Sequence, residues 1–189
     1  TPHNIIPLAP NGEHEIKPNI MLRGIEADHG VPAMSYAVLE YRKKLREEFR
    51  DMPQSKLREI KLSGTEITQT LQLPIVAFTG DTEMGDHLCR HEFVQSPIVI
   101  SECTFFEKDH RSRATIGKHL HIDDVAELLT IWGAKDVVLV HMSRRTTIEQ
   151  ARAAIVEKVN PSDLSRIHLL MDHKTNRDRY EKQLELVAE

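Results

Sequence analysis

Residues 74–82 read PIVAFTGDT, a short apolar run that stops at a threonine, a glycine and an aspartate. The same arrangement occurs in PIVISE at 97–102 and in DVVLVH at 136–141. Short apolar runs between turn-forming residues are typical of buried strands. In α/β sheets, ligand sites form beside the carboxyl ends of the strands, and these three runs end next to Asp81, Glu102 and His141. The sequence therefore predicts a polar edge on an α/β sheet, with residue types that suit a divalent metal.

Helices are predicted between and after these strands. Val125, Leu128, Leu129 and Trp132 follow the i, i+3, i+4, i+7 spacing of an amphipathic helix, so we expect Trp132 in the core. Thr146 and Glu149 have the spacing of a capping box at the start of the next helix. We further expect strands at 20–25, 34–41 and 167–171 and a terminal helix at 175–189. This β-α-β order predicts a layered α/β fold.

Residues 42–70 form a charged arm or insertion. Between 42 and 61 there are eight Lys and Arg residues against four Asp and Glu residues. Two interpretations stay open, a solvated helical segment, which we favour, and a basic arm that contacts phosphates.

Composition sets broad limits. The chain has 189 residues, 40% hydrophobic and 29% charged, as in an ordinary globular domain. Its apolar runs are too short to cross a bilayer. The formal net charge of -4 gives no general attraction to nucleic acid, so any RNA binding needs a local basic patch or bound metal. Two cysteines point to a reducing compartment, and we expect a cytoplasmic location.

Five motifs taken together resemble one family. They are DHGVP at 28–32, FTGDT at 78–82, SECTF at 101–105, KHLH at 118–121 and LVHMSRR at 139–145. In this order and with these separations they resemble ribonuclease Z, a tRNA 3' processing endonuclease of the metallo-β-lactamase superfamily. The resemblance covers roughly residues 20 to 155.

The resemblance implies a two-metal site with an assigned role for each residue. His29, Asp81 and His141 look like metal ligands for zinc, two ions being expected in the complete enzyme, with manganese as the alternative. Glu102 and His119 look like the catalytic pair in which a carboxylate orients a histidine beside the leaving group; His121 is the alternative histidine. Arg145 and Ser143 are expected to bind the substrate phosphate.

One family signature, a His-x-His-x-Asp-His cluster in the first half of the fold, is not found in this sequence. We therefore expect residues 1–189 to form one incomplete domain, mainly the C-terminal half of an αββα sandwich, with one face of its sheet uncovered. Three explanations stay open. The sequence is part of a longer enzyme, which we prefer; or a partner chain supplies the other half; or the protein is a non-catalytic remnant. A homodimer is expected.

The function implied is a metal-dependent phosphodiesterase, a zinc-dependent endoribonuclease that cuts the 3' side of tRNA precursors with metal-activated water. A second hypothesis is another hydrolase of the same superfamily, such as a cyclic-nucleotide phosphodiesterase or a small-ester hydrolase, which activity on a generic phosphodiester but not on tRNA would favour. A third is a binding or scaffolding protein with a dead site, for which the absence of bound metal in the full-length protein would be the sign.

Overall fold

One mixed sheet organises the chain. The computed structural model describes residues 5–187. Its seven strands stand side by side in chain order, and the sheet changes from antiparallel pairs (β1 to β4) to parallel pairs (β4 to β7). The strands are β1 (Glu13–Lys17), β2 (Ile20–Glu26), β3 (Met34–Leu45), β4 (Thr68–Phe78), β5 (Ile98–Glu102), β6 (Asp136–Val140) and β7 (Ile167–Leu169).

Helices lie in the connections between the parallel strands, because a parallel pair needs a long crossover, which is usually helical. The α-helices are α1 (Gln54–Leu62), α2 (His91–Val94), α3 (Arg111–Gly117), α4 (Ile122–Leu129), α5 (Ile148–Lys158) and α6 (His173–Val187). The 3-10 helices are η1 (Glu47–Phe49), η2 (Asp86–Cys89), η3 (Lys108–His110) and η4 (Pro161–Arg166). Among residues 5–187, no helix has the length and apolarity needed to cross a membrane.

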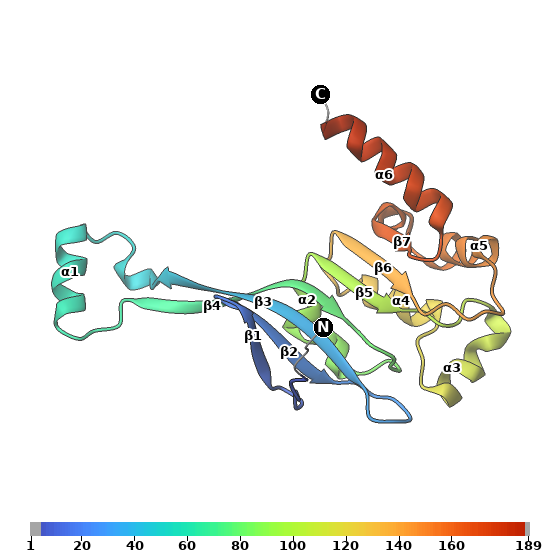
Figure 1. The fold of residues 1–189 in the computed structure, drawn as a ribbon, viewed down its shortest axis with the longest axis horizontal. Coiled ribbons are helices and arrows are strands. Elements are labelled where there is room, and N and C mark those ends of the chain that lie inside the picture. The colour runs from blue at the N-terminus through green and yellow to red at the C-terminus, as the bar shows by residue number, and fades with distance from the viewer. Residues whose placement is uncertain (1–4, 188–189) are drawn as a thin grey trace.

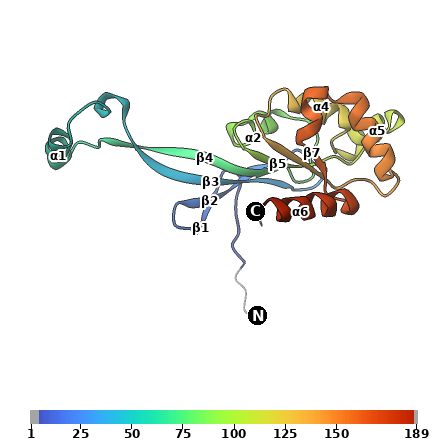
Figure 2. The same ribbon diagram turned by 90° about the horizontal axis from the view of Figure 1, so that it is seen from above.

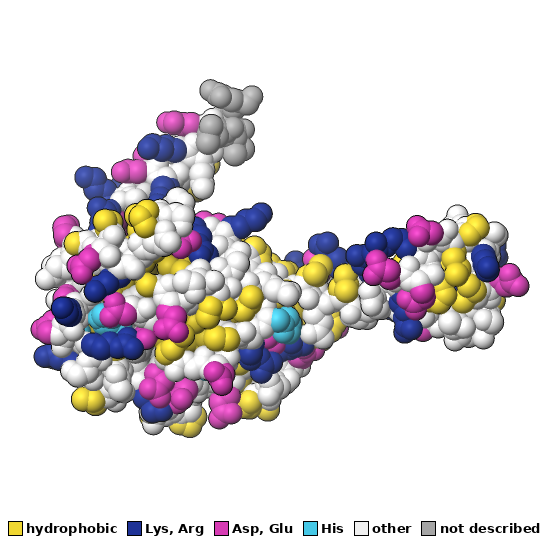
Figure 3. Space-filling model, turned by 180° about the vertical axis from the view of Figure 1, so that it is seen from behind, with side chains coloured by type: hydrophobic (Ala, Val, Ile, Leu, Met, Phe, Trp, Pro, Cys, Tyr) yellow, Lys and Arg dark blue, Asp and Glu magenta, His cyan; other side chains and the backbone are white. Residues whose placement is uncertain are grey.

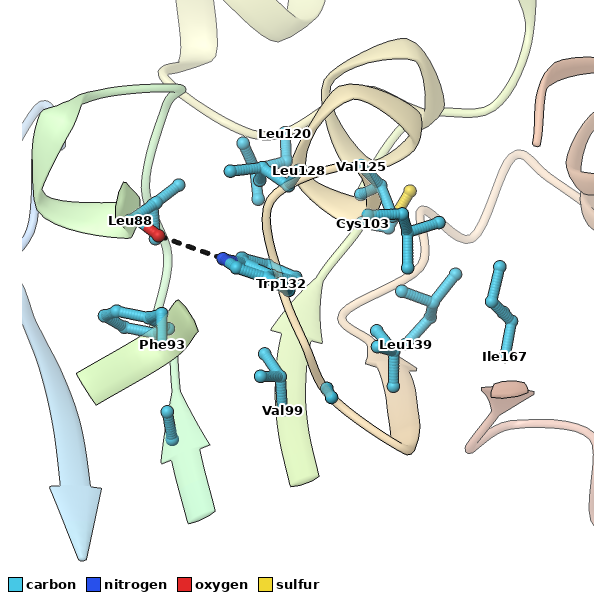
Figure 4. Packing of buried hydrophobic residues seen from close by; sticks show 14 of the residues in the cluster. Leu88, Phe93, Val99, Cys103, Leu120, Val125, Leu128, Trp132, Leu139 and Ile167 are labelled. Atoms are coloured by element: carbon cyan, nitrogen blue, oxygen red, sulfur yellow. Dashed lines mark hydrogen bonds between the residues drawn. The ribbon is translucent and has the colours of Figure 1, made fainter. Parts of the chain in front are cut away.

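The hydrophobic core lies between the sheet and helices α2, α4 and α5, which occupy the same side of it (Figure 2). Trp132 lies just beyond the end of α4, is 2% exposed, and stacks on Phe93 with 6.1 Å between ring centroids. Its indole N–H donates to the carbonyl of Leu88 at 2.9 Å (Figure 4). The prediction that Trp132 is a core residue is confirmed.

The opposite face of the sheet carries apolar side chains without such a cover. Along β3, Ala37 and Leu39 point into the core, while Tyr36 and Val38 alternate to the other face. A shallow depression of about 320 Å³ on that face is lined by Leu22, Tyr36, Val38, Val76, Phe78 and Ile100. Phe78 remains 38% exposed. This is the uncovered sheet face expected of half a sandwich.

The arm, residues 42–70, projects from the body as the continuation of β3 and β4 (Figure 1). Its strands pair from Arg42↔Leu71 to Leu45↔Thr68, and η1 and α1 form the tip. Neither tip helix contains a buried residue.

Two local predictions were wrong. The favoured helical segment over 42–61 is a strand as far as Leu45, because pairing with β4 overrides the helical propensity of its lysines and arginines. Within this segment, only η1 and α1 are helical. The capping box of α5 is Thr147 with Gln150, one residue later than predicted. Thr146 is buried and donates its hydroxyl to Glu107, so it is not available as a cap.

Candidate functional site

The parallel pairing of β4, β5 and β6 brings their carboxyl ends to one edge of the sheet. Asp81 follows β4, Glu102 ends β5 and His141 follows β6. His119 reaches the same place from the turn between α3 and α4. The edge predicted from the three apolar runs is therefore where the polar side chains meet.

Asp81, His119 and His141 form a compact group of possible metal ligands. One ligand atom from each lies within 4.8 Å of the others. Asp81 Oδ2 lies 3.6 Å from His141 Nε2, and the rings of His119 and His141 stack with 5.0 Å between centroids. A carboxylate and imidazoles, partly open to solvent, are a donor set that suits zinc or manganese.

Glu102 lies behind this group and is 1% exposed. Its Oε1 accepts hydrogen bonds from the Nδ1 of His119 at 2.8 Å and from the backbone N–H of Thr82 at 3.0 Å. Its Oε2 accepts the hydroxyl of Thr104 at 2.7 Å. A buried charge is tolerated when it is satisfied in this way. The hydrogen bond that His119 donates to Glu102 raises the pKa of His119 above the ordinary histidine value, against the effect of burial.

Thr104 extends the network to His141. The Glu102 carboxylate is acceptor-only, so the Thr104 hydroxyl donates to it and must accept the Nδ1–H of His141, at 2.8 Å. His141 thus keeps the lone pair of Nε2, which faces Asp81. Hydrogen bonds on the second ring nitrogen are how proteins fix the tautomer of a metal-binding histidine.

His29 lies beside this group rather than within it. Its ring centroid is 4.9 Å from that of His119. Its Nδ1–H donates to the backbone carbonyl of Lys118 at 2.9 Å, which leaves Nε2 free in the same manner as for His141. Of the three predicted metal ligands, the structure brings Asp81 and His141 together, with His119 as the third member of the group and His29 next to it.

Left-handed backbone conformations recur around the site. Gly80, Lys118 and His141 have φ of 62°, 52° and 61°. A Cβ at Gly80 would lie 2.5 Å from the carbonyl oxygen of Met34, so only glycine fits directly before Asp81. For His141 and Lys118 this conformation is unfavourable, and such strain concentrates at functional sites.

His121 has a structural role. It is 0% exposed and caps α4, its Nδ1 accepting from the N–H of Asp123 at 3.2 Å. Its Nε2 donates to the Glu107 carbonyl at 3.0 Å. With both ring nitrogens occupied, it has none for a substrate, and of the two candidate histidines only His119 reaches the site.

The two predicted substrate-binding residues lie in the loop after His141. The backbone N–H of Ser143 donates to the Thr104 carbonyl at 3.0 Å, while its hydroxyl accepts from the N–H of Arg145 at 3.3 Å. The Arg145 side chain is exposed. Sequence reasoning assigned no role to Thr104 or Lys118, although each is close in sequence to a predicted site residue, Glu102 or His119.

Comparisons with known proteins agree with the motifs. No protein-family model matches the chain. The chloroplastic tRNase Z TRZ2 of Arabidopsis thaliana is 31% identical over 156 residues, which cover 81% of this chain and 44% of that protein. The tRNase Z TRZ1 of the same plant is 26% identical over 157 residues, covering 81% of this chain and 56% of the relative.

The fold is also matched. The crystal structure of the metallo-β-lactamase fold protein YhfI from Bacillus subtilis aligns with a TM-score of 0.55 at 13% identity, over 87% of this chain and 52% of that one. The chain spans about half the length of the proteins it matches, as expected for a C-terminal half. The chain is therefore related to the ribonuclease Z proteins and has part of the metallo-β-lactamase fold.

Proposed function

We propose that this chain carries part of the active site of a metal-dependent phosphodiesterase, an endoribonuclease that cuts the 3' side of tRNA precursors. The observation that supports it most is the meeting of Asp81, His119 and His141 in front of the buried carboxylate of Glu102. The tRNA substrate rests on the likeness to the tRNase Z proteins.

His29, Asp81 and His141 are the proposed ligands, with zinc as the expected metal and manganese as the alternative. A bound divalent ion would lower the pKa of a water molecule and neutralise phosphate charge. The chain's own contribution is orientation: the Lys118 carbonyl and the Thr104 hydroxyl hold Nδ1–H of His29 and His141, so that both Nε2 atoms are free to bind.

His119 is proposed as the general acid. A metal ligand must be a neutral imidazole, whereas an acid must hold a proton. The raised pKa of His119 supports the second role. With Nδ1–H held by Glu102, the Nε2–H is free to protonate the departing 3' oxygen. The downstream product then carries the 5' phosphate.

The arm is the proposed RNA contact. Its basic residues are exposed, and Figure 3 shows Lys and Arg side chains along it. Since the whole chain has a net charge of -4, RNA binding requires a local basic surface, and the arm offers one. Arg145 and Ser143 remain proposed phosphate contacts beside the site.

The uncovered apolar face supports association with another polypeptide layer. That layer is either the remainder of a longer protein or a partner chain, and the homodimer stays a proposal that light scattering of the purified chain would test. Free thiols at Cys89 and Cys103 support a reducing compartment, for which we propose the cytoplasm.

The test uses the full-length protein with a 3'-extended precursor tRNA and zinc or manganese. We expect cleavage to yield a trailer with a 5' phosphate, and His119→Ala to slow it by about 10²–10⁴-fold, the usual contribution of a general acid. His173→Ala, which changes an exposed histidine at the start of α6, is the matched control. Asp81→Asn should abolish metal binding.

Two results would redirect the assignment. Hydrolysis of a cyclic nucleotide or of bis(p-nitrophenyl) phosphate, with precursor tRNA left intact, would favour another hydrolase of the superfamily. Full-length protein that binds neither zinc nor manganese would favour the scaffold.

A further inference from the structure

Lys118 joins three loops around the site. Its Nζ lies 2.6 Å from Asp28 Oδ1 and 2.7 Å from Glu83 Oε1. Asp28 directly precedes His29, Glu83 follows Asp81 by two residues, and Lys118 directly precedes His119. The ammonium group of the residue before His119 therefore contacts two residues that lie close in sequence to His29 and to Asp81.

Backbone contacts tie the same loops together. The Lys118 carbonyl accepts the Nδ1–H of His29, and the N–H of Glu83 donates to the carbonyl of Asp28 at 2.8 Å. The N–H of Asp28 also donates to the hydroxyl of Thr82 at 3.1 Å. The position of the His29 ring relative to His119 thus depends on where residue 118 is held.

The conformation of Lys118 is unusual for a lysine. It caps the end of α3 with φ 52° and ψ 55°, a left-handed conformation that glycine adopts most easily. Its side chain is only 37% exposed, and its two ion pairs reach across 90 and 35 residues of sequence. Ion pairs that are open to solvent usually add little to stability, so a purely stabilising role is a weak explanation for this arrangement.

We propose that Lys118 is a positioning residue, whose ammonium holds the loops of His29 and Asp81 against the His119 turn so that their ligand atoms face one centre. This proposal rests on the metal site of the proposed function. In this role Lys118 acts through the positions of the loops and does not itself contact the substrate.

The experiment measures cobalt(II) binding to the purified protein, by calorimetry and by the d–d absorption spectrum, for wild type and three variants. Lys118→Met removes the ammonium. Lys118→Gly also removes it but favours the left-handed backbone and keeps the carbonyl that His29 uses. Lys118→Arg restores a cation. Lys158→Met is the control, because Lys158 also makes two ion pairs, with Asp123 and Glu157.

We expect Lys118→Met and Lys118→Gly to weaken cobalt affinity about tenfold, as loss of an outer contact to a metal site usually does. Lys118→Arg should recover most of this loss, and Lys158→Met should bind as wild type. The melting temperatures of the metal-free variants should change little, which separates positioning from folding. Cobalt affinity unchanged in Lys118→Met would overturn the proposal.

A second readout does not depend on metal. The ¹⁵N signals of the His29 imidazole in the metal-free protein should report a single Nδ1–H tautomer in wild type and a mixture in Lys118→Met. If wild type binds no cobalt, the proposed metal site fails, and these signals alone decide the positioning role. Identical His29 signals in both proteins would then overturn it.

Discussion

Strands β3 and β4 run from the candidate site to the arm, and the two ends of this strand pair differ in how far their side chains are buried. At the site end, Ala37 and Ala77 pair and are each 1% exposed, with Gly80 fitted closely against Met34 just beyond β4. At the arm end, Lys43 pairs with Thr70, and both side chains are exposed.

The difference separates two kinds of constraint. Around the site, hydrogen bonds to the buried Glu102 and to Thr104 hold the rings of His119 and His141, so changes in this network alter geometry. On the arm, the backbone ladder sets the shape and the side chains are free to change. We therefore expect substitutions at the site end to affect stability and metal binding, and substitutions on the arm to affect RNA binding alone.

The largest effect is expected from a matched pair of truncations. Trp132→Ala should lower the free energy of unfolding by about 3–5 kcal/mol, the usual cost of removing a large buried aromatic side chain. Leu62→Ala on the arm, where the side chain is 79% exposed, should change it by about 0.5 kcal/mol or less. Urea unfolding measures both. Equal losses would mean that the arm tip is packed as tightly as the core.

A second comparison lies within the site network. Glu102→Gln should weaken metal binding and RNA cleavage by about 10–100-fold, because it disturbs the contacts of both His119 and His141. Thr104→Val interrupts only the link to His141 and should cost about tenfold. Thr130→Val, at an exposed helix end, is the control for calorimetric titration. A loss in Thr104→Val larger than in Glu102→Gln would contradict this order.

On the arm, the double substitution Lys43→Glu and Lys44→Glu should weaken RNA binding and reduce the slope of log affinity against log salt by about 1.5–2, as expected for the loss of two phosphate contacts. Hydrolysis of a small phosphodiester should not change. Lys135→Glu with Lys174→Glu changes the same charge on exposed sites of the body. An equal loss of RNA affinity in both double variants would show that only net charge matters.

The smallest effect is a pH dependence of stability. The pKa of His119 is raised in the folded state by Glu102, so the folded protein holds this proton more tightly than the unfolded chain. The resulting stabilisation is fully present below the ordinary histidine pKa of 6.5 and is lost as pH rises through the higher folded pKa. Urea unfolding of metal-free protein should show this decline, and Glu102→Gln should remove it. A rise in stability over that window would contradict the assignment.

Much of the sheet could be predicted from local pattern. The apolar runs before Asp81, Glu102 and His141 are strands in the structure, because a short buried run between turn residues has few other ways to fold. The charged sequence of the arm led to a wrong prediction of helix at residues 42–45. These residues pair with β4, a partner strand more than 20 residues away, which the local sequence does not reveal. The first capping residue of α5 was likewise decided by burial of Thr146.

The sequence by itself determined which residue types stand at the strand ends and, through five spaced motifs, the likeness to ribonuclease Z. Only the tertiary structure decided which side chains contact one another at the site. His119 and not His121 reaches the site, Thr104 links Glu102 to His141, and Lys118 reaches Asp28 across 90 residues. The physical reason is that hydrophobic pattern acts over a few neighbouring residues, whereas hydrogen-bond partners are set by how distant segments pack.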